Sequence, residues 1–218
     1  MSFKTLIRIR WFWYTLSFFT LRQQNKRMHY LIIGGGGFLG QSICDLLLEK
    51  GAKNKVSIFD LREPKQVAKG VFQVITGDIT QYDSVAKALK GVDVVIHTAS
   101  PIHGLSAEIY HKVNVEGTLN IIKACIQERV KKLVYTSSAG VVYNGQDLFC
   151  VDESEPYCEV HMDAYNETKA MAEELVLEAN GKGSLLTCAI RPSGIFGPRY
   201  ILLFCLMFCM SCIYQIDH

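Results

Sequence analysis

Short apolar runs alternate with stretches of helical periodicity along most of the chain. Runs rich in Val, Ile and Leu predict strands over residues 29–33, 55–60, 71–75, 92–97, 132–137 and 185–190. Apolar residues three or four positions apart predict helices over residues 38–50, 82–90, 106–128 and 164–179. Strands that alternate with helices form parallel sheets with a helix in each crossover. The pattern therefore predicts an α/β fold, a doubly wound parallel sheet with helices on both faces.

A glycine-rich turn joins the first predicted strand to the first predicted helix. Its glycines at 34, 37 and 40 are spaced G-x-x-G-x-x-G, and this strand–turn–helix context is typical of a dinucleotide site. Such a turn brings the backbone close to a pyrophosphate, which lies at the positive end of the helix. We expect five residues to contact the cofactor: Gly34, Gly37, Phe38, Leu39 and Gly40. We interpret Gly35 and Gly36 as flexible filler, and the sheet as Rossmann-type.

Asp60 ends the second predicted strand, about 20 residues beyond Gly40. An acidic residue at this position accepts hydrogen bonds from the adenosine ribose hydroxyls and repels a 2′-phosphate. The sequence therefore favours NAD over NADP. Arg62 is close enough to weaken that preference.

Two later segments carry groups suited to acid–base chemistry. Tyr165 and Lys169 are four residues apart, so they share a helix face, and an ammonium there lowers a phenol pKa that is ordinarily near 10. Thr136, Ser137 and Ser138 lie where the fifth strand ends, the edge at which open α/β sheets bind ligands. A lone Y-x-x-x-K match is often chance. The order of glycine turn, Asp60, strand-end serine and Tyr/Lys pair argues against chance.

Composition and charge narrow the class of protein. The 218-residue chain has a net charge of +2, and no basic stripe interleaves with aromatic residues in its centre, so nucleic acid is not an expected partner. We interpret three of the eight cysteines as reduced and buried, at positions 44, 125 and 188. Cys205, Cys209 and Cys212 lie in an apolar run, and apart from the last residue no His is nearby. We therefore expect no metal site at these three cysteines.

The motifs together resemble those of a known family. The matching segments are Ile33–Gly40, His97–Gly104, Val113–Thr118, Tyr135–Val141, Asn144–Asp147, Met162–Lys169 and Ile190–Arg199. With them the chain is similar to the extended short-chain dehydrogenases/reductases. Within that group it resembles the 3β-hydroxysteroid dehydrogenases, and among these the fungal decarboxylating sterol-4α-carboxylate type. The likeness is continuous over residues 28–199, and the segments around His97, Asn144 and Met162 are the most specific.

The resemblance implies roles for single residues. Tyr165 is the implied catalytic acid/base, and Lys169 the residue that lowers its pKa and binds the nicotinamide ribose. Ser138 is the implied substrate-orienting hydroxyl, with Ser137 as the alternative. The remaining implied cofactor contacts are Asp78 and Ile79 beside adenine, and Thr98, Ala99, Ser100, Pro192 and Ser193 at the nicotinamide end. His97 and His111 are expected to be structural, and Asn114 either supports the site or only packs.

The resemblance also implies a reaction and a location. The expected reaction oxidises the 3β-hydroxyl of a 4α-carboxysterol with NAD and releases CO₂, at the cytosolic face of the endoplasmic reticulum membrane. A homodimer or a sterol-demethylation complex is the expected assembly. Two alternatives stay open: an NAD-binding remnant without catalysis, and another extended dehydrogenase/reductase such as a different steroid dehydrogenase or a nucleotide-sugar epimerase.

The two ends of the chain differ from its centre. Residues 1–27 carry six Lys or Arg and no acid around an aromatic run, which suits an interfacial anchor, a leader or a disordered extension. Residues 28–199 form the predicted NAD-binding domain. Residues 200–218 begin with fifteen uncharged residues, a borderline length for a membrane helix. Family members continue past this point into a substrate lobe, so we expect most of that lobe to be lacking.

Overall fold

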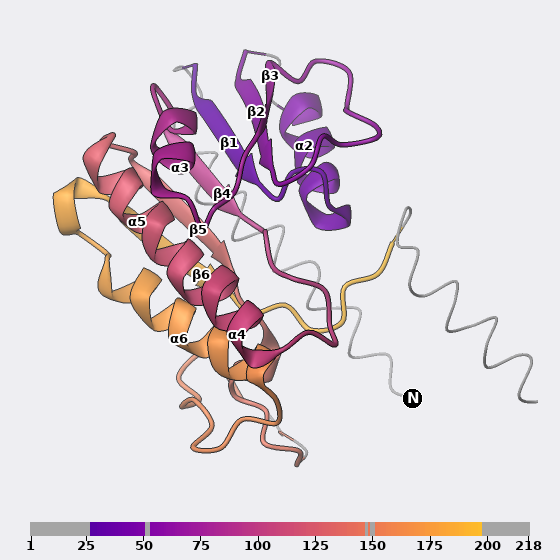
Figure 1. Cartoon of the computed structure of the whole chain (residues 1–218), viewed down its shortest axis with the longest axis vertical. Helices are drawn as coiled ribbons and strands as arrows, with labels where there is room; N and C mark the ends of the chain where they lie inside the picture. Colours follow the sequence, from indigo (N-terminus) through magenta and orange to yellow (C-terminus); the bar gives the residue numbers. More distant parts are fainter. Residues whose placement is uncertain (1–26, 51–52, 147, 149–150, 198–218) are drawn as a thin grey trace, which may run out of the picture.

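Six parallel strands form the centre of the protein. The computed structural model describes residues 27–50, 53–146, 148 and 151–197. Its strands are β1 (His29–Ile33), β2 (Lys55–Asp60), β3 (Gln73–Thr76), β4 (Val94–His97), β5 (Lys132–Thr136) and β6 (Leu186–Ile190). They pair side by side in the order β3-β2-β1-β4-β5-β6, each pair parallel (Figure 1). The order reverses between β1 and β4, which is where such sheets bind ligands. The predicted doubly wound Rossmann-type fold is confirmed.

Helices cover the two faces of the sheet because the strand side chains alternate in direction. On one face, Leu31 and Ile33 pack in a core with α3 (Tyr82–Ala88), α5 (Gly117–Gln127) and α6 (Ala164–Glu178). On the other face, Tyr30 and Ile32 pack against α2 (Phe38–Lys50). All four of these strand residues are at most 3% exposed, so β1 is buried on both faces, as a central parallel strand must be.

The predicted boundaries agree with the structure at β1, α2 and β2 and differ elsewhere. Strand β3 begins at Gln73 rather than at residue 71. The helix predicted over residues 106–128 divides into α4 (Ala107–Tyr110), a π-helical turn (His111–Glu116) and α5. Helix α5 can lie close to the loop after β3 because Gly117 has no side chain. A Cβ there would lie 2.8 Å from Ile79 Cδ1.

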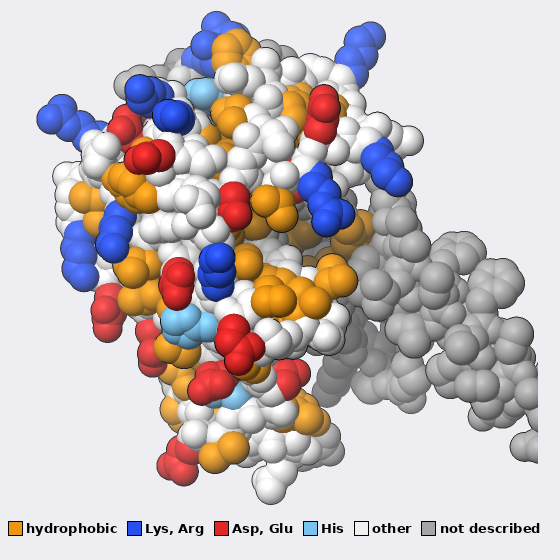
Figure 2. All heavy atoms as spheres, viewed as in Figure 1, with side chains coloured by type: hydrophobic (Ala, Val, Ile, Leu, Met, Phe, Trp, Pro, Cys, Tyr) orange, Lys and Arg blue, Asp and Glu red, His pale blue; other side chains and the backbone are white. Residues whose placement is uncertain are grey.

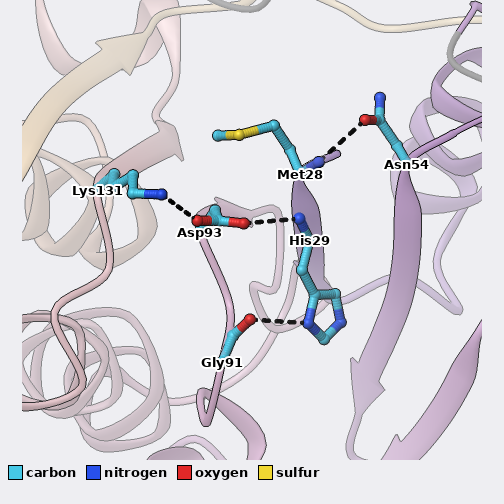
Figure 3. Close-up of polar contacts among 6 residues, drawn as sticks. All are labelled: Met28, His29, Asn54, Gly91, Asp93 and Lys131. Atoms are coloured by element: carbon cyan, nitrogen blue, oxygen red, sulfur yellow. Dashed lines mark hydrogen bonds and ion pairs between the residues drawn. The ribbon is translucent and has the colours of Figure 1, made fainter. Parts of the chain in front are cut away.

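Polar contacts tie the amino ends of three strands together (Figure 3). Asp93, just before β4, accepts a hydrogen bond of 3.0 Å from the backbone N–H of His29 and pairs with the Lys131 ammonium before β5. The His29 ring contributes a further contact, with Nδ1 3.1 Å from the Gly91 carbonyl oxygen. These contacts fix the register of β1, β4 and β5 at the edge opposite their carboxyl ends.

The surface carries both signs of charge. In Figure 2, Lys and Arg side chains lie among Asp and Glu side chains in the upper part of this face, whereas its lower part shows Asp and Glu; apolar side chains lie between them. Within the described ranges, no helix is long and apolar enough to span a bilayer. The two predicted tails, 1–27 and 200–218, lie outside the described residues except for Arg27, so their roles stay predictions.

Candidate active site at the carboxyl edge of the sheet

The glycine turn between β1 and α2 is shaped by close backbone contacts. Gly34 has φ +83°, and a Cβ there would lie 2.6 Å from the backbone nitrogen of Ala99. At Gly40 a Cβ would lie 2.3 Å from the Gly34 carbonyl oxygen. Side chains at either position would displace backbone. Gly37 differs because it is exposed, and a Cβ added there would lie 3.3 Å from the Gly34 carbonyl oxygen. The Gly37 backbone is therefore open to solvent.

The expectation that Gly35 and Gly36 are flexible filler is wrong. Gly35 is buried, and a Cβ there would lie 2.7 Å from Ile58 Cγ2 of β2. Gly36 donates its backbone N–H to Asp60 Oδ2 at 2.9 Å. Both glycines therefore join the turn to β2, a contact between distant residues that spacing alone does not reveal.

Asp60 lies at the carboxyl end of β2, beside the glycine turn. Its Oδ1 also accepts the backbone N–H of Arg62 at 3.3 Å. Two backbone donors thus fix a half-buried carboxylate next to the predicted pyrophosphate position. Carboxylate oxygens accept more than one hydrogen bond each, so capacity remains for ribose hydroxyls.

The residues after β3 continue the same edge. Asp78 Oδ1 accepts the backbone N–H of Thr80 at 2.8 Å. The Ile79 side chain is buried, and its carbonyl oxygen accepts Asn120 Nδ2 at 3.0 Å. Phe38 and Leu39 open α2 and are half-buried. All four stay predicted cofactor contacts.

The loop after β4 links the glycine turn to α6. Thr98 Oγ1 donates to the Ile33 carbonyl oxygen at 2.9 Å, and Ala99 lies against Gly34. Ser100 Oγ donates to Asn114 Oδ1 at 3.0 Å, and Asn114 Nδ2 donates to Thr168 Oγ1 at 3.1 Å. The Asn114 side chain is therefore part of a polar chain that starts at the exposed Ser100 and reaches the buried Thr168 on the helix carrying Tyr165 and Lys169.

Tyr165 lies among aromatic rings at the start of α6. Its ring centroid is 4.6 Å from that of His103 and 5.8 Å from that of Tyr110. Burial raises the pKa of the Tyr165 phenol, and Asp163 and Tyr110 raise it further, whereas a hydrogen bond with Ser100 lowers it. The sequence led us to expect a lowered pKa. In this structure the loss of water around the phenol has the larger effect.

Lys169 is buried, with only 2% of the residue exposed. Its Nζ donates to the Thr136 carbonyl oxygen at 2.5 Å and lies 4.2 Å from the centroid of the Tyr135 ring. Burial lowers the Lys169 pKa to about 7, and the Glu173 carboxylate opposes that fall. The ammonium is thus held by β5, one helical turn from Tyr165, and not by the phenol itself.

The two strand-end serines differ in exposure. Ser138 is half-buried, and its Oγ accepts the backbone N–H of Gly140 at 3.1 Å. Ser137 Oγ is buried without a hydrogen-bond partner in the described part of the chain. A Cβ at Gly140 would lie 2.0 Å from Asn166 Oδ1, so the turn after Ser138 packs against the residue that follows Tyr165. The Ser138 hydroxyl is therefore more accessible to a substrate than the Ser137 hydroxyl.

Residues after β6 approach the same turn. Pro192 accepts the backbone N–H of Ala139 through its carbonyl oxygen at 2.9 Å, and Ser193 is exposed beside it. The predicted nicotinamide-end contacts thus follow the carboxyl ends of β4 and β6, and Ser138 follows β5, the strand between them.

His97 is buried beside Lys169. Burial lowers the His97 pKa to about 3, and the Lys169 charge lowers it further, so the ring is neutral near pH 7. Its Nε2 lies 3.1 Å from Thr118 Oγ1. A neutral ring fits the structural role expected from the sequence.

A buried ionic cluster next to Lys169 was not foreseen. Glu173 on α6 pairs with Arg191 after β6, with Nη2 2.8 Å and Nε 2.9 Å from Glu173 Oε1. Tyr157 donates its hydroxyl to the same oxygen at 3.1 Å. No periodicity joins these three residues, although Glu173 follows Lys169 by four positions and so shares its helix face.

Metal ligands do not gather in this region. Across the described residues, no group of three or more His, Cys, Asp or Glu side chains is arranged to hold a metal ion. The cysteine group at 205, 209 and 212 falls outside those residues.

The fold agrees with comparisons to known proteins. Residues 31–211 match the model of the 3-beta hydroxysteroid dehydrogenase/isomerase family. The decarboxylating sterol-4-alpha-carboxylate 3-dehydrogenase of Candida albicans is 48% identical over 177 residues, which are 77% of this chain and 51% of that protein. The enzyme of the same name from Schizosaccharomyces pombe is 50% identical over 176 residues, 78% of this chain and 51% of its own length.

A solved structure extends the comparison to an enzyme with another substrate. Thermus thermophilus UDP-glucose 4-epimerase in complex with NAD has a TM-score of 0.68 and 29% identity, covering 79% of this chain and 57% of the epimerase. The chain spans about half the length of the two sterol dehydrogenases. The family match extends over most of the chain, and so the chain belongs to the 3-beta hydroxysteroid dehydrogenase/isomerase family.

Proposed function

We propose that this chain binds NAD and carries the catalytic residues of a decarboxylating 3β-hydroxysteroid dehydrogenase that acts on 4α-carboxysterols. The observation that carries the proposal is the gathering of Tyr165, Lys169 and Ser138 at the carboxyl edge of the sheet that also holds the glycine turn. The names of the fungal relatives supply the substrate class.

The glycine turn and Asp60 fit a dinucleotide. A cofactor pyrophosphate can approach the turn because Gly37 is exposed and carries no side chain, and the α2 amino end then faces it. The Asp60 carboxylate is already fixed by Gly36 and can accept ribose hydroxyls. Bound NAD would supply the hydride acceptor for the carbon that bears the substrate hydroxyl.

The chain's own residues would move the proton. In the proposed reaction, Tyr165 as the phenolate takes the 3β-hydroxyl proton, and the Ser138 hydroxyl orients the substrate oxygen. Lys169, one turn along α6, contributes positive charge and favours the phenolate. Because Tyr165 is half-buried, a positive charge nearby is screened less than it would be beside an exposed tyrosine.

Loss of CO₂ follows from the substrate's own chemistry. Oxidation at C3 produces a ketone whose α carbon, C4, carries the carboxylate, so the product is a β-keto acid. The electrons of the breaking C–C bond then enter an enolate, and the enolate is protonated afterwards. A single oxidation is therefore enough for decarboxylation.

Turnover by the full chain tests the proposal. The protein is given a 4α-carboxy-3β-hydroxysterol and NAD, and NADH and CO₂ are followed together. We expect both products in equal amounts, and a fall of roughly 10²–10⁴-fold in Tyr165→Phe with NAD binding retained. Ser138→Ala should reduce turnover less, since it removes an orienting hydrogen bond only. Full activity of Tyr165→Phe, or CO₂ without NADH, would contradict the mechanism.

A nucleotide-sugar epimerase is the second candidate, since the Thermus enzyme shares this fold at 29% identity. The same preparation is therefore assayed with UDP-glucose. Epimerisation without sterol oxidation would replace the proposal, and NAD binding without either reaction would favour a catalytically silent protein.

We also propose that the protein works at the endoplasmic reticulum membrane, facing the cytosol. The support is the sterol substrate class of the relatives and the aromatic, basic run near the amino end. Cells expressing the full chain or residues 28–199 are fractionated, and we expect more of the full chain with membranes. Equal distribution of the two would contradict anchoring by the tails.

A further inference from the structure

The buried cluster around Glu173 lies directly behind Lys169. Glu173 is one helical turn after Lys169 on α6, and only 2% of the residue is exposed. Its Oε1 accepts hydrogen bonds from Arg191 and Tyr157, while Oε2 has no partner among the described residues although it is buried. A carboxylate with one unpaired buried oxygen is costly to keep in a protein interior.

The cluster joins three separate parts of the chain. Tyr157 belongs to the segment before α6, Glu173 to α6, and Arg191 to the first position after β6. Arg191 also lies over the Tyr157 ring at 5.1 Å, and its Nη1 is 3.5 Å from the Glu155 carbonyl oxygen. The Glu173 carboxylate is therefore held in one position by groups that do not depend on Lys169.

We propose that Glu173 is a positioning residue that keeps Lys169 charged and directed to the carboxyl edge of the sheet, an inference that rests on the catalytic role proposed for Lys169. Among the described groups near Lys169, the Glu173 carboxylate, one helical turn along α6, supplies negative charge. Tyr135 and His97 contribute neutral rings from β5 and β4, Thr136 contributes a carbonyl oxygen, and Tyr165 lies one turn back on α6.

Near neutral pH the Glu173 carboxylate determines how much of Lys169 is protonated, because burial and this charge act in opposite directions on the Lys169 pKa. Burial lowers the Lys169 pKa to about 7, with Glu173 opposing the fall. Without the carboxylate, the ammonium would lose its proton at a lower pH, and much of the protein would carry a neutral amine at pH 7. A neutral amine neither stabilises a phenolate nor forms a charge-assisted hydrogen bond.

The Lys169 side chain can be titrated without any turnover. The full chain is labelled with ¹³C at the lysine ε carbon, and the Lys169 signal is assigned by its absence in Lys169→Met. In Glu173→Gln we expect the midpoint of its titration to fall by about one pH unit or more. Glu174→Gln is the matched control, because Glu174 is the next residue on α6 but is exposed. In this variant the Lys169 midpoint should equal that of the unchanged chain.

A second variant covers the case in which Glu173→Gln does not fold, since that change leaves the half-buried Arg191 without its charged partner. Glu173→Gln combined with Arg191→Gln removes both charges and should still lower the midpoint. An unchanged Lys169 midpoint in either folded variant would overturn the inference. Absence of sterol oxidation would instead overturn the proposed function and leave this titration interpretable.

Discussion

Lys169 should destabilise the folded protein near neutral pH, and methionine at this position should relieve the cost. Its pKa falls from an ordinary value of 10.5 to about 7, so between these values the unfolded chain binds more protons than the folded one. Stability of the unchanged protein must then rise with pH through this range, by up to about 1.4 kcal/mol per pH unit. The buried ammonium costs about 4 kcal/mol at pH 7 and about 2 kcal/mol at pH 9.

Methionine retains much of the volume of lysine but has no proton to gain or lose. Lys169→Met leaves the Thr136 carbonyl oxygen without its donor, a cost of about 1 kcal/mol that does not change with pH. The variant should therefore be more stable than the unchanged protein at pH 7, by about 3 kcal/mol. That advantage should shrink by about 2 kcal/mol at pH 9.

Urea denaturation of both proteins at pH 7, 8 and 9 measures this difference. Lys123→Met serves as the control, because Lys123 is an exposed lysine on α5 and its replacement should give a curve parallel to that of the unchanged protein. If the free energies of unfolding of Lys169→Met and the unchanged protein stay parallel from pH 7 to 9, the ammonium is not buried as described. The reasoning on its charge would then be wrong.

Further predictions concern the cofactor turn. Gly35→Ala should lower stability by about 1–3 kcal/mol through its contact with Ile58, whereas Gly37→Ala should unfold at nearly the same temperature as the unchanged protein but bind NAD more weakly. Equal thermal stability of the two variants would contradict the contacts described at the turn. Asp60→Asn should weaken NAD binding by roughly 1–3 kcal/mol in calorimetry, and tighter binding of NADP than of NAD to the unchanged chain would refute the role given to Asp60.

The central strands β1 and β2 were predictable because they are buried on both faces and consist largely of apolar residues. β1 and β2 match their predicted bounds for this reason, and α2 follows the glycine turn at the expected residue. The π-helical turn was not predictable from apolar spacing. Asn114 within this turn makes hydrogen bonds to Ser100 and Thr168, which are contacts between segments that apolar spacing does not reveal.

The site was predictable where chemistry and spacing coincide. Tyr165 and Lys169 lie on one helix face as their separation requires. The pKa values of these two residues were not predictable, because each depends on burial and on the partners that the sheet supplies. Glu173 and Arg191 escaped notice for a related reason, since their pairing joins a helix to a strand end and leaves no pattern in the sequence.

The π-helical turn at His111–Glu116 makes the site more sensitive to the number of residues than to their identity. A π-helical turn accommodates one residue more than the α-helical turn it replaces, so deletion of one residue there would restore regular α-helical bonding. Because the π-helical turn already absorbs the extra residue, α4 and α5 would keep their relative rotation, and only the residues within the turn would shift. Asn114 would then turn away from Ser100 or Thr168, and the polar link from the β4 loop to α6 would break. Related chains that carry Asn114 should therefore keep the length of this turn.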